Sequence, residues 1–388
     1  MKKAMSKMFY PWLHLSMSFA TQLTIDLINI SIIGRTDNPV DLAAVSLGNI
    51  LVIMFVLSVV QGMSTALETL VSQAYGAQQP LICGEHLNRI RFINFLIFIP
   101  ISLLLTQSES LLVFLGQDAA VSKVAATYII YQLPGLFMFS LFEANRLFLN
   151  SMEMTKQAST VLIVALPFHI ALCCYFVFAK NWGVLGLALA IDITYTLCFL
   201  VITGYCIKTK NETVRAAWVT PNEESLEGWT ALLELGIPGV LVYFIDFGSF
   251  EAAAIFSGLI GIVELSTMGI ILIVVQIVTC SAYGMQFTAA VFIGNSIGAQ
   301  NVTKAKMYAK AAVVLVMSVE ICMALLVYLS RNFLGRAFTS DPDVLEMYSR
   351  DIVFAAIFMI PDSLQLVMVG ILKALGLQTP SFKRAIVA

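Results

Sequence analysis

The sequence predicts an all-α protein that crosses a lipid bilayer many times. Of its 388 residues, 59% are hydrophobic and only 12% are charged, which is far from the composition of a soluble domain. Apolar stretches of about 20 residues, the length that a helix needs to span the hydrocarbon core, recur along the chain. The first half of the sequence also resembles the second half, which predicts two pseudo-symmetric helical bundles.

Ten stretches are expected to span the membrane, and one polar segment divides them into two sets. Residues 208–229 form the long hydrophilic segment, so we predict an N-terminal six-helix bundle at 1–207, a cytoplasmic linker at 208–229 and a C-terminal bundle at 230–388. The second bundle then holds four helices. The ten stretches run near 10–33, 45–72, 90–107, 121–145, 157–179, 183–207, 231–261, 267–294, 309–331 and 351–376.

The basic residues between the stretches predict the orientation. With a cytoplasmic N-terminus, 16 Lys and Arg residues fall on the cytoplasmic side and 6 on the other side. Loops rich in Lys and Arg stay in the cytoplasm. We therefore expect both termini to be cytoplasmic. The tally places Arg146 and Lys373 among the loop charges.

The two halves align with each other without a gap. A shift of 222 residues places 61–78 on 283–300, with five identities in eighteen positions. Gln73 then corresponds to Asn295. Both copies have the same orientation, and such parallel repeats around a central cavity are typical of transporters. The alternative is that two helices merely end in the same Gly-Ala cap.

Two carboxylates interrupt the stretch 241–262. Asp246 and Glu251 lie near its middle, where an ionised acid is costly to bury in hydrocarbon. Such acids face a water-filled cavity, hold a proton or pair with a cation. They are separated by roughly 140° around a helix, so both can border one wide cavity. Asp362 directly follows Pro361, which can break its helix and open this acid to the cavity.

Several long segments resemble the multidrug and toxic compound extrusion (MATE) family, of eukaryotic type. The second-helix signature is the closest match, and the similarity runs from about residue 25 to 378. The resemblance implies two six-helix bundles that face each other across a V-shaped cavity. It also implies antiport, in which substrate leaves the cytosol while H⁺ or Na⁺ enters. The segments are 42–48, 62–77, 246–251, 257–265, 294–299 and 362–378.

The resemblance assigns roles to residues and also shows departures. Asp246 and Glu251 match the paired seventh-helix acids, and Asp362 matches the tenth-helix acid, so these three are the predicted cation- and proton-coupling residues. The family has about twelve spans, whereas this sequence continues after the tenth only with the tail 379–388. Phe292 and Lys373 stand where arginines are usual, which puts the cytoplasmic gate in doubt.

Further polar residues are secondary candidates for coupling. Asn29 stands where many prokaryotic members have an aspartate, and Asp26 lies one turn earlier, with a structural hydrogen bond to Gln22 or Asn29 as its alternative role. Glu68 fits packing or gating better than substrate contact. The remaining secondary candidates are Gln73 and Asn295, and the residues expected to line the substrate cavity and stack on a cation are Tyr243, Phe247 and Phe250.

The sequence therefore predicts a secondary active antiporter. It would export organic cations or other xenobiotics and metabolites in exchange for protons, because the membrane-buried charges found in the seventh and tenth stretches are acidic. We expect a monomer that needs no cofactor, metal or nucleic acid, in the plasma membrane or an endomembrane such as the vacuole. No nucleophile or metal-binding pattern indicates an enzyme.

Two alternatives to this function stay open. One is a flippase for a lipid or a lipid-linked substrate, of the same superfamily, which would need basic residues in its cavity to hold a phosphate. The other is a fragment that transports nothing, because the last two helices of the family are missing.

Overall fold

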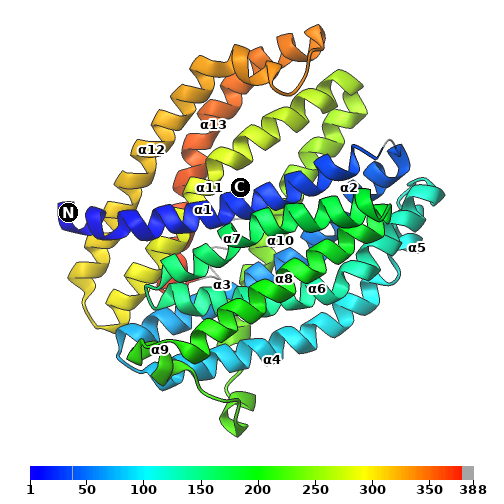
Figure 1. Ribbon diagram of the computed structural model, residues 1–388. Helices are drawn as coiled ribbons and strands as arrows, with labels where there is room; N and C mark the ends of the chain where they lie inside the picture. The colour runs from blue at the N-terminus through cyan, green and yellow to red at the C-terminus, as the bar shows by residue number, and fades with distance from the viewer. Residues whose placement is uncertain (37, 378–388) are drawn as a thin grey trace.

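Long helical segments make up most of the part of the protein that the structure describes (Figure 1). The structure, a computed structural model, describes residues 1–36 and 38–377. Within this part, ten segments are long and apolar enough to cross a membrane, which confirms the predicted polytopic all-α fold. They are α1 (Lys2–Ile33), α2 (Pro39–Val52) with the π-helical turn η1 (Ile53–Leu57) and α3 (Ser58–Gly76), α4 (Pro80–Leu105), α6 (Ala119–Ser151), α7 (Thr155–Cys173) with the π-helical turn η2 (Cys174–Ala179), α8 (Gly183–Lys208), α10 (Thr230–Ile260), α11 (Ile262–Gly298), α12 (Val302–Arg336) and α13 (Pro342–Ala374).

Most helices extend beyond the predicted apolar stretches, because capped polar turns continue them. At the start of α13, the Asp341 side chain accepts a hydrogen bond of 2.9 Å from the backbone N–H of Asp343, and Pro342 occupies the first turn. An acidic cap followed by proline is a strong helix start. The sequence analysis did not predict three short elements in the connections, which are α5 (Ser108–Phe114), α9 (Glu212–Ala217) and η3 (Glu223–Leu226).

Proline does not break the long helices. The expectation that Pro361 interrupts the tenth span is wrong, because α13 continues through it from Pro342 to Ala374. Pro134 and Pro238 likewise lie inside α6 and α10. A proline removes one backbone donor, and neighbouring helices and local adjustment stabilise the remaining turn inside a membrane protein.

The helices form two groups. One group surrounds α6, which packs against α2 and α8, and shares a large apolar core built from α2 to α8. The other group comprises α11, α12 and α13, with smaller cores of its own. Figure 1 shows α12 and α13 on the opposite side of the molecule from α4 and α6, with α1, α3, α10 and α11 between them.

Two helices cross from one group to the other. The first half of α1 belongs by sequence to the N-terminal bundle, yet Met8 and Trp12 are buried in the same cluster as residues of α11 and α12. The Trp12 indole donates a 2.8 Å hydrogen bond to the carbonyl oxygen of Ser281. In return, the first half of α10 packs on α3 of the other bundle. The first halves of α1 and α10 therefore tie the bundles together.

The contacts of the glycines follow the internal repeat. A Cβ atom at Gly76 would overlap the carbonyl group of Asn295, and one at Gly298 would overlap that of Gln73. The 222-residue shift exchanges these two contacts, which is the pattern expected of a pseudo-twofold axis between α3 and α11. The two helices also end alike, with Gln78 and Gln300 at φ of 60° and 56°.

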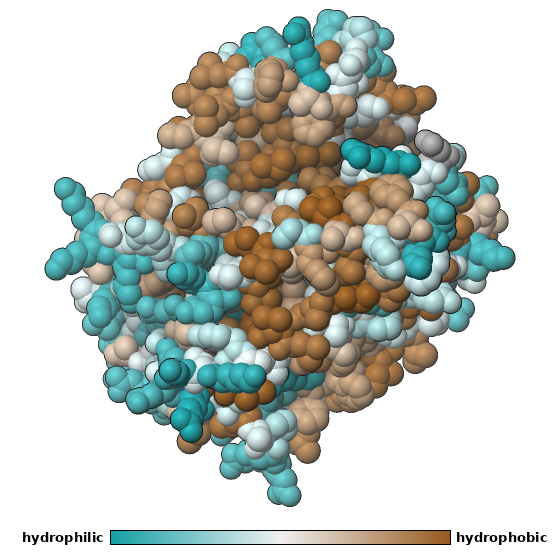
Figure 2. Space-filling model, viewed as in Figure 1, coloured by the Kyte–Doolittle hydropathy of each residue, from teal (hydrophilic) through white to brown (hydrophobic). Residues whose placement is uncertain are grey.

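We call the end of the molecule where α3 and α11 finish the linker end, because the segment 208–229 lies there. Figure 2 shows hydrophobic residues across the middle of this face, between hydrophilic regions at the linker end and at the opposite end. Large apolar side chains such as Leu103, Leu200 and Phe354 are exposed on the helices. A hydrophobic belt between two polar ends is what a bilayer requires.

Candidate functional site

A cavity of about 190 Å³ lies where the middles of the crossing helices meet. Its walls come from α1, η1, α3, α10 and α11, so both halves of the sequence contribute to it. Tyr243, Phe247 and Phe250, the three predicted aromatic residues, all line it, and their role there stays a prediction. The other lining residues are Phe19, Gln22, Leu23, Asp26, Ile53, Leu57, Gln61, Glu251, Val275, Gln276, Thr279, Cys280 and Tyr283.

The charged residues that line this cavity are both acidic. Glu251 comes from α10 and Asp26 from α1, and each is half-buried. Neither carboxylate makes a hydrogen bond or ion pair within residues 1–36 and 38–377, so the structural hydrogen bond considered for Asp26 is not formed. Among the described residues, no Lys, Arg or His lines it. The cavity therefore offers negative charge and aromatic faces, which together suit an organic cation.

Asp246 lies behind the cavity wall. It is absent from the lining, and its carboxylate accepts a 3.0 Å hydrogen bond from the Tyr283 hydroxyl, which does line the cavity. Tyr283 also stacks on Phe19, with the ring centroids 5.6 Å apart. The expectation that Asp246 and Glu251 both border one cavity is therefore met only by Glu251. The sequence analysis missed Tyr283, because nothing in its local pattern marks a tyrosine of the eighth span as an acid's partner.

Asp362 is half-buried on α13 and is also absent from the cavity lining. Since α13 continues through Pro361, no helix break opens this carboxylate to the cavity. Asp246 and Glu320 are the charged groups that act on it. The three predicted coupling acids thus occupy three different positions, and Glu251 alone among them touches the cavity.

Asn29 belongs to a separate buried network inside the N-terminal bundle. Its side-chain oxygen lies 2.8 Å from Nε2 of His169, whose Nδ1 lies 2.9 Å from the Thr194 hydroxyl. All three residues are buried. Asn29 is absent from the cavity lining, and its amide oxygen is engaged by this histidine of α7.

A second polar cluster lies between the cavity and the linker end. The Lys373 ammonium donates a 3.3 Å hydrogen bond to the Tyr243 hydroxyl, and Gln286 donates one of 3.5 Å to the same oxygen. Lys373 is 3% exposed, and Glu68 beside this cluster is 1% exposed. Arg146 forms a buried pair with Glu143 at 2.5 Å.

This cluster corrects the assignment of loop charges. Arg146 and Lys373 were placed in cytoplasmic loops, but they are buried within α6 and α13. A long apolar run precedes each of these two residues in the sequence. It indicated that a helix could continue through the residue and bury it. Without these two charges the basic bias keeps its direction, so the predicted orientation does not depend on them.

The linker end is closed by contacts between the bundles. Lys7 of α1 pairs with Glu153 at 2.8 Å, and the Asn295 amide donates a 3.2 Å hydrogen bond to the same glutamate. The Lys7 ammonium also lies 4.9 Å from the ring centre of Phe292. A cavity of about 610 Å³ lies beside these residues and is bordered by Lys7, Glu153, Phe292 and Asn295. Gln73, the repeat partner of Asn295, donates a hydrogen bond of 2.9 Å to the carbonyl oxygen of Ala374.

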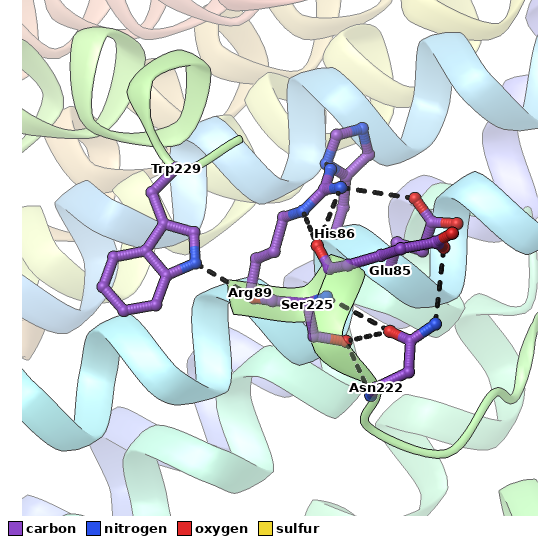
Figure 3. A network of polar contacts seen from close by, with 7 residues as sticks. Glu85, His86, Arg89, Asn222, Ser225 and Trp229 are labelled. Atoms are coloured by element: carbon purple, nitrogen blue, oxygen red, sulfur yellow. Dashed lines mark hydrogen bonds and ion pairs between the residues drawn. The ribbon is translucent and has the colours of Figure 1, made fainter. Parts of the chain in front are cut away.

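The linker is held against α4 by a polar network (Figure 3). The Arg89 guanidinium donates hydrogen bonds of 3.2 and 3.3 Å to the carbonyl oxygen of Glu224 and pairs with Glu85 at 3.4 Å. The Trp229 indole donates a hydrogen bond of 3.0 Å to the carbonyl oxygen of Ser225. These contacts fix the linker on the N-terminal bundle just before α10 begins.

The family model named MatE matches residues 15–175 and 238–388, which together form most of the chain. The chain belongs to the MATE family. This is a family of transporters, which agrees with the prediction that the protein is not an enzyme. The two matched segments lie on either side of the linker that the structure shows on α4, and the second extends beyond the described residues.

Curated relatives of this chain come from fungi, plants and animals. An uncharacterized transporter of Schizosaccharomyces pombe is 31% identical over 348 residues, which are 89% of this chain and 63% of that protein. Protein DETOXIFICATION 16 of Arabidopsis thaliana is 27% identical, with coverage of 92% and 73%. Multidrug and toxin extrusion protein 1 of Oryctolagus cuniculus is 28% identical, with coverage of 93% and 64%. The chain thus spans less than two thirds of the first and the third of these proteins.

Solved MATE structures share the fold. The crystal structure of the eukaryotic MATE transporter AtDTX14 matches with a TM-score of 0.91 at 25% identity, covering 97% of this chain and 84% of that one. A mutant of the Vibrio cholerae MATE transporter VcmN also matches with a TM-score of 0.91, at 18% identity, covering 100% of this chain and 87% of that one. At that identity the second likeness concerns the fold alone.

Proposed function

We propose that this MATE protein is a secondary active antiporter that exports organic cations, or other xenobiotics and metabolites, in exchange for protons. The observation that carries the proposal is the cavity between the bundles. Two carboxylates from different bundles and several aromatic rings line it, and it has no basic lining residue. A cation placed there gains charge attraction in a site with largely apolar and aromatic walls, where electrostatic interactions are stronger than in bulk water.

Exchange follows if proton and substrate compete for the same carboxylates. A protonated acid is neutral and attracts a cation weakly, whereas the ionised acid attracts it strongly. Glu251 and Asp26 meet the substrate directly in this account. Asp246 acts from behind Tyr283, because its charge determines whether the tyrosine hydroxyl remains turned toward the carboxylate or is free for the substrate. The proposed coupling ion is H⁺, and no cofactor takes part.

The cavity argues against the flippase alternative. A lipid headgroup carries phosphate, which binds to Arg, Lys or backbone N–H donors. The basic residues nearest the cavity are Lys373 and Arg146, and Lys373 is separated from it by the Tyr243 ring while Arg146 is paired with Glu143. An anionic headgroup in the cavity would therefore meet two carboxylates and no cation.

A comparison of substrates in proteoliposomes tests this proposal. With a pH gradient imposed, we expect accumulation of a radiolabelled organic cation at least about tenfold above that of an organic anion of similar size, and no movement of a fluorescent phospholipid between leaflets. The Glu251→Gln variant should lose most cation uptake, while Glu109→Gln, which removes an exposed acid on α5, should not. Phospholipid movement would favour the flippase, and the absence of any flux would favour the fragment alternative.

A further inference from the structure

The strongest unexplained feature of this structure is the buried Glu68 carboxyl. Glu68 is 1% exposed on α3, and neither of its oxygens has a hydrogen-bond partner within residues 1–36 and 38–377. A buried ionised carboxylate without partners is very costly. A purely structural role explains Glu68 poorly, because a leucine or glutamine would fill the same space at a lower cost.

The charges that face Glu68 come from both bundles. Lys373 on α13 and the Arg146–Glu143 pair on α6 act on it electrostatically without direct contact, while Tyr243 on α10 is the uncharged titratable group nearby. Arg146 is already neutralised by its bidentate contact with Glu143, at 2.7 and 2.5 Å. Lys373 has a neutral partner only, the Tyr243 hydroxyl at 3.3 Å. Two carboxylates, Glu68 and Asp246, act on Lys373, and of these Glu68 is the one whose oxygens accept no hydrogen bond within the described residues.

Glu68 and Lys373 lie on opposite sides of the boundary that must open at the linker end. The Thr69 hydroxyl donates a 2.8 Å hydrogen bond to the carbonyl oxygen of Lys373. The Gln73 amide donates one of 2.9 Å to the carbonyl oxygen of the next residue, Ala374. These bonds join α3 of one bundle to α13 of the other. Any movement that opens the linker end breaks them and pulls Glu68 away from Lys373.

We propose that Glu68 and Lys373 form a protonation-dependent gate that holds the linker end closed. With Glu68 ionised, separating the bundles would separate two opposite charges in a medium of low dielectric constant. With Glu68 protonated, the attraction is lost and the bundles can part. A proton on Glu68 thus permits opening, and its release favours closure. This proposal rests on the proposed proton antiport and adds a coupling residue outside the substrate cavity.

A distance measurement between the bundles tests the gate without measuring transport. One spin label at Lys156→Cys on α7 and another at Thr303→Cys on α12 report separation at the linker end, and both positions are exposed. The background needs Cys174→Ser and Cys322→Ser, because these native cysteines are exposed. Distance distributions are recorded in nanodiscs between pH 5 and pH 9.

In the protein with Glu68 and Lys373 unchanged, we expect the fraction of molecules with an open linker end to rise as the pH falls. Glu68→Gln should raise the open population at neutral pH by at least roughly fivefold, the lower end of ordinary coupling between two sites. The variant should also lose most of the pH response. Lys373→Met should open the linker end in the same way, and the double variant should show no further opening, because the same attraction is removed only once.

The controls separate this proposal from the proposed function and from misfolding. Glu251→Gln should keep the pH response of the distances while losing cation exchange, because Glu251 lines the cavity and is not among the charges that act on Lys373. If Glu68→Gln stays closed with its pH response intact, or if the two single effects simply add in the double variant, Glu68 is a packing residue and the gate is refuted. If a single variant fails to fold, the double variant, which buries neither charge, is measured in its place. Its distance distributions must not change with pH, and a remaining pH response would refute the gate.

Discussion

At the residue scale, the arrangement around Asp246 distinguishes coupling from simple packing. The carboxylate is half-buried and accepts its hydrogen bond from Tyr283, whose ring forms part of the cavity wall. Tyr283 therefore lies between the Asp246 carboxylate and the cavity in which the substrate is proposed to bind. A substitution at Asp246 should therefore change the hydrogen bonding of the Tyr283 hydroxyl in the cavity, while every atom of the cavity wall stays in place.

We predict that Asp246→Asn abolishes exchange and leaves the protein folded. An amide keeps the shape and can still accept the Tyr283 hydrogen bond, but it never carries a charge. The loss of a charged hydrogen-bond partner corresponds to about 1.5–3 kcal/mol, so we expect flux to fall roughly 10- to 100-fold. Initial uptake rates in proteoliposomes and the thermal melting of the purified variant measure the two effects. Normal transport would assign coupling to Glu251 or Asp362, and a variant that does not fold would make Asp246 structural.

The sequence analysis located many of these residues but not their contacts. It identified Glu251, Tyr243, Phe247 and Phe250, because acids and aromatics stand out in an apolar stretch. Tyr283 was missed and Lys373 was placed in a loop, since a hydrogen bond between α10 and α11 or α13 depends on how helices pack, and spacing along one chain does not encode that.

At the element scale, the structure shows how α1 and α10 connect the bundles. The first half of α1 packs on the second bundle, and its Lys7 reaches back to Glu153 in the turn between α6 and α7. This ion pair crosses the linker end beside Phe292, where the family resemblance leads one to expect an arginine. The Lys7 ammonium of α1 lies 4.9 Å from the ring centre of Phe292.

We predict that the pair formed by Lys7 and Glu153 contributes modestly to closure of the linker end. Lys7 is about half exposed and Glu153 about a quarter, and exposed ion pairs contribute only about 0–1 kcal/mol. Lys7→Glu or Glu153→Lys should increase cysteine accessibility at the linker end by up to about fivefold. The charge-swapped double variant should restore the original accessibility. A double variant as open as the single ones would show that the two side chains do not act as a pair.

The helical elements could be predicted well from sequence, and their ends and continuity less well. Apolar stretches placed all ten spans, whereas caps such as Asp341 lengthened them and packing carried α13 through Pro361. The internal repeat indicated that 61–78 and 283–300 are equivalent, and the reciprocal contacts of Gly76 and Gly298 show this equivalence in space. Residues 378–388, which include the expected tail, lie outside the described residues.

At the scale of the whole molecule, the basic residues predict that the linker end faces the cytoplasm. A cysteine placed at Lys210, which is exposed in the linker, should react with a membrane-impermeant maleimide only after the cells are permeabilised. A cysteine at Lys123, exposed near the start of α6 at the opposite end, serves as the matched control and should react in intact cells. Labelling of the linker from outside would reverse the orientation and the direction of the proposed export.

Flux of an organic cation under separately imposed ion gradients tests proton-coupled cation export most directly. In proteoliposomes made with all 388 residues, we expect cation movement to follow an opposing pH gradient and to ignore a sodium gradient of the same size. The Glu109→Gln control should behave like the original protein, and Asp246→Asn should respond to neither gradient. Flux that follows the sodium gradient and is indifferent to the pH gradient would contradict the account.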